Sequence, residues 1–110
     1  MKKLLTTIAI IGSLTAFGQT AQDNYNKGNE KANAKDYAGS IKDFDKAVKL
    51  DPKYTDAYYN RGTSKMYMKD YKGAITDFDK AIELKPDFLN AFTNRGVAKL
   101  KLDQTTSTTK

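Results

Sequence analysis

The residues of this chain that could carry out chemistry are few, and most of them are carboxylates and carboxamides. Histidine and cysteine are both absent from the 110 residues. Their absence removes the commonest general base, the commonest metal ligand and the thiol nucleophile, and it also rules out a disulfide. The composition therefore argues against an enzyme, and we expect neither a metal site nor any other cofactor.

The only constellation of carboxylates is the Asp-Phe-Asp sequence, which occurs at 43–45 and again at 77–79. Two residues that are two apart on a helix point about 200° away from each other, so the aspartates of one segment cannot jointly hold a metal ion or flank one substrate. A lysine follows the first aspartate of each segment by three residues, which is the spacing of ordinary ion pairs on a helix surface. We interpret both segments as solvated helix faces.

A second set of residues recurs along the chain at a fixed spacing. Gly28, Gly62 and Gly96 are 34 residues apart, each preceded by a basic residue and, one residue earlier, by an asparagine. Ten further residues return 34 positions later, namely Tyr37, Gly39, Ile41, Asp43, Phe44, Asp45, Lys46, Ala47, Leu50 and Pro52. A single period of this length indicates a repeat protein.

Each 34-residue unit contains two segments with helical periodicity. The first, which we call helix A, is predicted over 23–34 and 55–68, and the second, helix B, over 37–50 and 71–84. A polar turn separates the two helices, and a proline two residues after helix B ends it, because the residue before proline is disfavoured in the α conformation. The predicted fold class is all-α.

The repeated glycine lies inside helix A, where glycine costs about 1 kcal/mol relative to alanine. Its recurrence at Gly28, Gly62 and Gly96 needs a structural reason. We expect that helix A approaches a neighbouring helix too closely at these three positions for a Cβ to fit.

The period and the residue types together resemble the tetratricopeptide repeat (TPR) family. That family has a large residue at repeat position 4, glycine at 8, tyrosine at 17, a small residue at 20, phenylalanine at 24, alanine at 27 and proline at 32. The residues that match in this chain include Tyr58, Phe92, Gly62, Tyr71, Ser40, Ala74, Phe78, Ala81 and Pro86.

The resemblance implies a right-handed α-solenoid of antiparallel helix pairs, with five helices after the N-terminal segment. We place repeats at about 21–54 and 55–88 and a half repeat at 89–102, within a domain that spans 19–103. The Thr-rich tail over 104–110 is expected to be disordered.

Two repeat positions depart from the family pattern. Position 7 is usually apolar and position 11 is usually aromatic, but both are basic in all three units: Lys27, Arg61 and Arg95 at position 7, and Lys31, Lys65 and Lys99 at position 11. We expect their aliphatic stems to cover the helix pair while their charges reach water.

The resemblance also implies that the A helices line a concave groove that holds a peptide or helix of a partner protein. The groove positions of this chain are Tyr25, Asn26, Asn29, Asn33, Asp56, Tyr59, Asn60, Thr63, Tyr67, Asn90, Thr93, Asn94 and Val97. Side-chain amides offer a donor and an acceptor to an extended backbone, and tyrosines add contact area. The alternative is that the asparagines only pack between helices.

Two narrower classes of ligand are disfavoured. TPR domains that hold the acidic C-termini of cytosolic chaperones use two asparagines, matched by Asn29 and Asn60, and three basic residues, where this chain has Tyr25, Asn90 and Asn94. The lysines alternate with acidic residues and form no run, so no nucleic acid is expected as a partner. We therefore favour an adaptor whose partner is a protein or peptide.

The alternative function is a structural subunit that self-associates, as a homodimer, through its C-terminal helix edge. In the half repeat, Ala91, Arg95, Ala98 and Leu102 form a stripe along one side of the helix. No helix B follows in the sequence, so we expect this stripe to be uncovered. A monomer with a frayed C-terminal end is the other outcome that the stripe allows.

The first residues predict an export signal. Two lysines precede an apolar run over 4–17, and Ala16 and Gly18 are the small residues that a signal peptidase requires. We expect residues 1–18 to be removed, which leaves Gln19 first and a protein that is periplasmic or secreted and has no membrane anchor. An uncleaved anchor and a buried first helix are the alternatives, although the run is short for a bilayer span.

Overall fold

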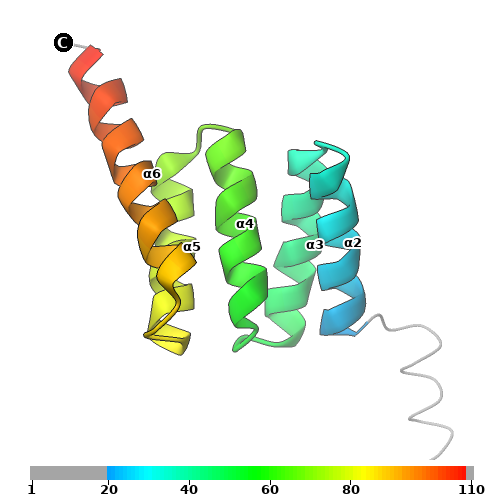
Figure 1. Ribbon diagram of the computed structural model, residues 1–110. Coiled ribbons are helices and arrows are strands. Elements are labelled where there is room, and N and C mark those ends of the chain that lie inside the picture. The colour runs from blue at the N-terminus through cyan, green and yellow to red at the C-terminus, as the bar shows by residue number, and fades with distance from the viewer. Residues whose placement is uncertain (1–19, 109–110) are drawn as a thin grey trace, which may run out of the picture.

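The computed structural model describes residues 20–108, and this part of the chain consists of five α-helices and no strand (Figure 1). The helices are α2 (Ala21–Asn33), α3 (Tyr37–Leu50), α4 (Thr55–Tyr67), α5 (Tyr71–Leu84) and α6 (Leu89–Thr108). The all-α prediction is confirmed, and the predicted bounds of both B helices agree with α3 and α5. The predicted signal peptide, 1–18, lies outside the described residues.

Aspartate side chains determine where the two B helices begin. The carboxylates of Asp36 and Asp70 accept hydrogen bonds from the amides of Gly39 and Gly73, both at 3.0 Å. These bonds satisfy a backbone donor that the helix itself cannot pair. A Cβ on either glycine would collide with the capping carboxylate, so glycine at this repeat position leaves room for the cap.

The turn from helix A to helix B passes through the left-handed region in both complete repeats. Lys35 and Lys69 have φ values of 65° and 66°. The amides of Asp36 and Asp70, which follow them, donate to carbonyls near the end of helix A at 2.8 Å. This conformation reverses the chain within three residues and satisfies carbonyls that the helix end leaves unpaired.

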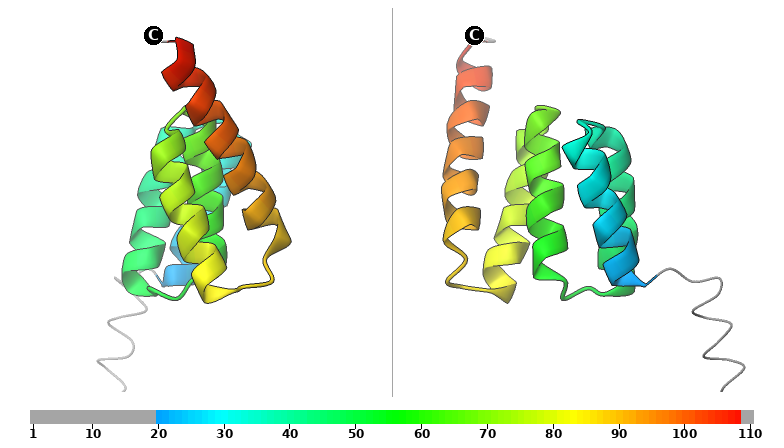
Figure 2. Two further views of the ribbon diagram at one scale, coloured as in Figure 1. Left: turned by 90° about the vertical axis from the view of Figure 1, so that its left-hand side faces the viewer. Right: turned by 45° about the vertical axis from the view of Figure 1, so that its right-hand side comes forward.

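The helices stand in a row, and each packs mainly on the helices before and after it in the chain (Figures 1 and 2). The three A helices, α2, α4 and α6, also contact one another in order along the row. The core between the helices is made of two aromatic rings and small side chains, namely Phe44, Phe78, Ala47, Ala57, Ala74, Ala81, Ala91 and Ala98. Small side chains at helix contacts allow the backbones to approach closely.

The repeated glycines do not all have the same surroundings. A Cβ on Gly28 would lie 2.5 Å from Cε1 of Phe44, and one on Gly62 would lie 2.8 Å from Cε1 of Phe78. A Cβ on Gly96 would have nothing within 4 Å, so the close approach expected there is absent. The reason is that the phenylalanine comes from helix B of the same repeat, and within residues 20–108 no helix B follows α6.

The expectation of a disordered tail is wrong for residues 104–108, because α6 continues to Thr108. Neither glycine nor proline occurs after Gly96 to end the helix. The Thr105 and Thr106 hydroxyls donate to backbone carbonyls four residues earlier, at 2.9 Å and 3.2 Å. The last turns of α6 project beyond the ends of the other helices (Figure 1), and residues 109–110 lie outside the described part.

The predicted uncovered stripe on the half repeat is also wrong. Ala91 and Ala98 are fully buried, and Leu102 is partly buried. Ala98 packs with Phe78 of α5, so this side of α6 faces the preceding B helix. The row that α6 leaves exposed lies on another side and contains Leu89, Phe92, Gly96 and Leu100.

Candidate functional site

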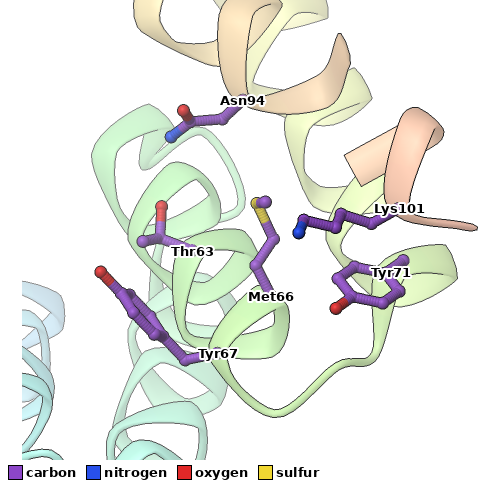
Figure 3. Close-up of a pocket in the computed structure, with 6 residues that line it drawn as sticks. All are labelled: Thr63, Met66, Tyr67, Tyr71, Asn94 and Lys101. Atoms are coloured by element: carbon purple, nitrogen blue, oxygen red, sulfur yellow. The ribbon is translucent and has the colours of Figure 1, made fainter. Parts of the chain in front are cut away.

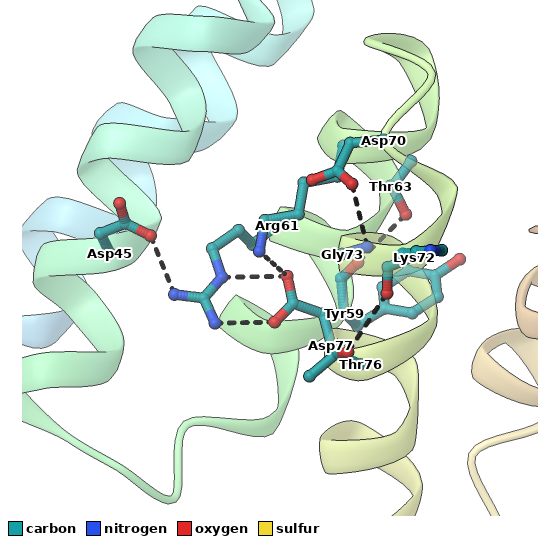
Figure 4. A network of polar contacts seen from close by, with 10 residues as sticks. Asp45, Tyr59, Arg61, Thr63, Asp70, Lys72, Gly73, Thr76 and Asp77 are labelled. Carbon is teal, nitrogen blue, oxygen red and sulfur yellow. Dashed lines mark hydrogen bonds and ion pairs between the residues drawn. The ribbon is translucent and has the colours of Figure 1, made fainter.

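The polar side chains of the Asp-Phe-Asp segments connect helices to one another. Arg61 donates from Nε and Nη2 to the two carboxylate oxygens of Asp77, at 3.0 Å and 2.7 Å, and Lys65 Nζ lies 3.1 Å from the same carboxylate. Arg61 Nη1 also donates to Asp45 of the preceding repeat at 2.9 Å. Figure 4 shows the guanidinium between these two aspartates. In the first repeat, Lys31 pairs with Asp43 at 2.8 Å.

The interpretation of these segments as solvated is therefore wrong for Asp43 and Asp77, which are both buried. The expectation that the basic side chains reach water is likewise wrong for Arg61, whose side chain is 16% exposed, whereas the Lys31 side chain pairs with Asp43 and still stays 45% exposed. The reason is that these positions of helix A face helix B, and a buried carboxylate is stable only when cations or donors pair with it.

The ion pairs change the protonation equilibria of their cations. The hydrogen bond to Asp43 raises the pKa of the Lys31 ammonium above its ordinary value. Burial by itself would lower the pKa of the Arg61 guanidinium, but the bonds to Asp77 and Asp45 outweigh burial and raise it. Both side chains are therefore held in the charged form, which fits a structural role.

Asparagine and tyrosine side chains link successive A helices. Asn60 Nδ2 donates to Tyr25 Oη at 3.0 Å and to Asn29 Oδ1 at 2.8 Å. One period later, Asn94 Nδ2 donates to Tyr59 Oη at 2.9 Å. The asparagines thus do pack between helices, as the alternative interpretation held, but through only one of the two polar atoms of each amide.

The rings of the two linking tyrosines belong to the packing between repeats. Tyr25 lies 4.9 Å from Tyr54 between ring centroids, and Tyr59 lies 4.7 Å from Phe88. Each ring also contacts the core phenylalanine of its own repeat. Both tyrosines were predicted to line the groove, but these contacts make them supports for it.

Two neighbouring hollows lie between the A helices. The hollow between α2 and α4 has a volume of about 420 Å³ and is lined by Asn29, Ala32, Asn33, Tyr37, Asn60, Thr63, Ser64 and Tyr67. The hollow between α4 and α6 has a volume of about 270 Å³ and is lined by Thr63, Met66, Tyr67, Tyr71, Asn94 and Lys101 (Figure 3). Because Thr63 and Tyr67 line both, we describe the two hollows together as the A-face trough.

The structure brings together only part of the predicted groove. The predicted residues that line the trough are Asn29, Asn33, Asn60, Thr63, Tyr67 and Asn94. The predicted residues that are exposed and line neither hollow are Asn26, Asp56, Asn90, Thr93 and Val97. The Asn26 side-chain oxygen Oδ1 instead accepts a hydrogen bond from Gln22 Nε2 at 3.0 Å.

Six residues that line the trough were missed, namely Ala32, Tyr37, Ser64, Met66, Tyr71 and Lys101. Tyr37 and Tyr71 are the first residues of the B helices, and their recurrence beside the turn after helix A was a signal that could have placed them here. Lys101 lies one period after Tyr67, so the repeat also aligns it with a trough residue.

The first hollow offers polar groups and an exposed aromatic ring. Within residues 20–106, the Asn60 carbonyl oxygen and the Asn29 amide nitrogen have no hydrogen-bond partner. The Tyr67 ring stacks on Tyr37 with a centroid distance of 4.6 Å and an interplanar angle of 5°. Tyr67 nevertheless stays 65% exposed, so its other surface is open to a ligand.

The second hollow combines apolar surface with one cation. The Lys101 side chain extends alongside Met66 and Tyr71, with Asn94 and Thr63 on the far side of the hollow (Figure 3). In the part of the chain that the structure describes, no group of three or more acidic side chains could hold a metal ion.

Family models locate the repeats in the sequence. The model described as "Tetratricopeptide repeat" matches residues 55–88, and the one described as "TPR repeat" matches residues 28–66. This chain belongs to the TPR family. The first of these matches has the bounds expected for the second repeat, and the family resemblance is confirmed.

Solved TPR structures resemble the chain over most of its length. The MamA protein is 26% identical with a TM-score of 0.77, over 82% of this chain and 49% of that one. The TPR2B domain of yeast Sti1, in a pHsp70 complex, is 25% identical with a TM-score of 0.73, over 79% and 70%. The second TPR domain of human RPAP3, in complex with an HSP70 peptide, is 27% identical with a TM-score of 0.74, over 78% and 72%.

The TPR chain described here spans about half the length of the two MamA chains. No curated protein sequence matches it. Among residues 20–108, no helix is both long enough and apolar enough to cross a membrane. The fold is that of a protein-interaction module.

Proposed function

We propose that this TPR chain binds an extended segment of another protein in the A-face trough. The observation that carries the proposal is Tyr67, a large aromatic residue that lines both hollows and remains 65% exposed. Large exposed aromatic side chains in a polar surround are typical of binding sites. Two similar TPR domains are described in complexes with pHsp70 and with an HSP70 peptide, which supports a peptide as the ligand.

The polar groups of the first hollow suit a peptide backbone. The unpaired side-chain oxygen Oδ1 of Asn60 can accept a hydrogen bond from a backbone N–H of the ligand. The unpaired side-chain nitrogen Nδ2 of Asn29 can donate one to a backbone carbonyl of the ligand. The bond between the two asparagines, at 2.8 Å, holds these groups next to each other. A pre-positioned donor and acceptor favour an extended segment, because a helix satisfies its own backbone groups.

The second hollow favours a segment with an acidic side chain next to an apolar one. Lys101 supplies the only charge among the residues that line it, and Met66 and Tyr71 supply apolar surface. We also propose that the protein acts outside the cytoplasm, as a periplasmic or secreted adaptor, because the segment 1–18 has the composition of an export signal.

Peptides selected from a random library against the purified protein provide the test. Tyr67→Ala is expected to weaken the selected peptides on the order of tenfold or more, the scale of a central aromatic contact. Met68→Ala is the matched control, because Met68 is the next residue, is 51% exposed and lines neither hollow. Fluorescence anisotropy with the labelled peptides measures both variants.

The Lys101→Gln variant tests the charge preference. The variant is expected to bind acidic peptides more weakly than the native chain does and to bind neutral peptides equally well. The difference in affinity for acidic peptides should become smaller as the salt concentration rises. Selected peptides that bind the Tyr67→Ala variant as tightly as the native chain would show that the trough is not the binding site.

A further inference from the structure

The α4 helix shows what one face of an A helix accepts. Phe78 of α5 lies over Gly62, where a Cβ would be 2.8 Å from the ring. The residue before this phenylalanine, Asp77, pairs with Arg61 at 2.7 Å and with Lys65 at 3.1 Å. Helix B is thus held by a ring over a glycine and by a carboxylate between two cations.

The first repeat follows the same rule. Phe44 of α3 lies over Gly28, and Asp43, the residue before it, pairs with Lys31. In both repeats the lysine follows the glycine by three residues. The chain therefore shows twice that this face of helix A is a receptor for an acidic residue followed by phenylalanine.

Within residues 20–108, α6 carries the same receptor face and no helix covers it. Gly96 is preceded by Arg95 and followed three residues later by Lys99. Arg95 Nη1 donates to Asp79 at 2.7 Å, as Arg61 does to Asp45, and the Arg95 guanidinium lies 5.2 Å from the centroid of the Phe92 ring. Within residues 20–106, no second carboxylate pairs with Arg95 and none pairs with Lys99.

The surface around Gly96 is apolar and open. Leu89, Phe92 and Leu100 are 76%, 40% and 64% exposed, and nothing lies within 4 Å of the position of a Cβ on Gly96. These residues lie along one side of α6, with the two cations beside them. In repeat proteins, an apolar helix face of this kind is normally buried against the next helix, and its burial stabilises the fold.

We propose that this face of α6 docks an amphipathic helix from a separate partner protein, and that this helix carries a phenylalanine directly preceded by aspartate or glutamate. The phenylalanine ring lies over Gly96, in the open space that we call the notch. The preceding carboxylate pairs with Lys99 and with the nitrogens of Arg95 that Asp79 does not bind. This surface lies apart from the A-face trough, so the inference stands whether or not a peptide binds there.

Charge argues for a different protein as the partner and against a second copy of this chain. Two α6 faces in contact would bring Arg95 and Lys99 of one copy against those of the other, which is repulsive. The chain has three Asp-Phe pairs, at 43–44, 77–78 and 87–88. Phe44 and Phe78 are fully buried, and Phe88 lies in the turn before α6 with its ring against Tyr59, so a folded copy presents none of them on a free helix.

A peptide with the sequence of residues 71–84, acetylated and amidated at its ends, is the probe, because it is the helix that α4 binds. Titrated into the purified protein, it is expected to shift the backbone NMR resonances around Gly96 and Lys99. Peptides carrying Phe78→Ala or Asp77→Asn are expected to bind at least about tenfold more weakly.

The matched protein variant is Gly96→Leu, which fills the notch. Because the notch is open, the variant should unfold at the same temperature as the native chain or above it, and it should lose at least about tenfold in affinity for the peptide. Tyr67→Ala in the trough should leave peptide binding unchanged.

Three results would overturn the proposal. The first is a peptide affinity that does not change in Gly96→Leu, and the second is equal binding of the Phe78→Ala peptide. The third is a dimer in sedimentation equilibrium of the native chain that Gly96→Leu abolishes, because it would make a second copy the occupant of the face.

Discussion

Gly62 lies so close to Phe78 that a Cβ on the glycine would be 2.8 Å from Cε1 of the ring. The ring is fully buried, so it cannot move without displacing its neighbours. Gly62→Ala is expected to destabilise the fold by about 1–3 kcal/mol through overpacking, reduced by the roughly 1 kcal/mol that alanine contributes as a better helix former. Urea denaturation measures the free energy of unfolding.

Gly96→Ala is the matched control, because the same substitution occurs there at the equivalent repeat position with nothing within 4 Å. The gain in helix propensity is then unopposed, and stability is expected to rise by about 0.5–1 kcal/mol. If the two variants change stability by equal amounts, close packing is not the reason for the glycine at position 62.

The ion pair network gives a second comparison between repeats. Arg61→Gln leaves Asp77, which is 2% exposed, with Lys65 alone, and it is expected to cost about 2–4 kcal/mol because a buried carboxylate loses a bidentate partner. Arg95→Gln removes a bond to Asp79, which is 55% exposed, and it is expected to cost at most about 1 kcal/mol. Thermal unfolding of both variants checks this difference, and a larger loss for Arg95→Gln would contradict it.

The period of 34 residues was enough to predict the helix pairs, because each repeat contains its own turn, capping aspartate and proline. It could not separate the two packing faces of an A helix. Ala91 and Ala98 face the preceding B helix, whereas Gly96 faces the place of the following one. Both sides look equally apolar in the sequence, and only the partner helix distinguishes them.

The candidate site was predicted less well for a similar reason. Tyr59 and Tyr67 are both tyrosines of the same polar helix, α4, but Tyr59 contacts Phe88 while Tyr67 stays exposed. The difference depends on which side chains of the next repeat cover each ring. The burial of Asp77 had the same origin, since its cations lie 12 and 16 residues earlier in the sequence and on another helix.

The left-handed turn residues offer a way to stabilise the protein. Lys69 has a φ of 66°, a conformation that is strained for a residue with a Cβ and relaxed for glycine. Lys69→Gly is expected to raise stability by about 0.5–1 kcal/mol. Lys46→Gly, in the middle of α3, should lower it by about 1 kcal/mol, and denaturant midpoints that move in the same direction for both would contradict the expectation.

The ion pair of the first repeat predicts loss of stability in alkaline solution. The hydrogen bond to Asp43 raises the pKa of Lys31 above its ordinary 10.5, so folding favours the charged ammonium. The contribution is complete below the ordinary pKa and is lost as the pH rises through the raised one. Tyr54 adds to the trend, because burial raises the pKa of its phenol above 10.0, which makes folding favour the neutral form.

The measurement is the denaturant midpoint at several pH values between about 8 and 12. The native chain is expected to lose stability towards the upper end of that range, and Lys31→Gln should show a smaller loss. A midpoint that falls equally with pH in both proteins would exclude the Lys31 pair as a cause.

The N-terminal segment predicts that the exported protein begins at Gln19. Ala16 and Gly18 place small side chains where signal peptidase binds them, and the basic and apolar stretches before them match an export signal. The capping Thr20 accepts a hydrogen bond from the amide of Asp23 at 3.0 Å, so cleavage after Gly18 would leave the first described helix and its cap intact.

The intact mass of protein recovered from a bacterial periplasm or medium should correspond to residues 19–110, with or without cyclisation of the N-terminal glutamine. Gly18→Pro should block processing, whereas Ser13→Ala should not. Recovery of the native chain with Met1 in the membrane fraction would contradict the prediction.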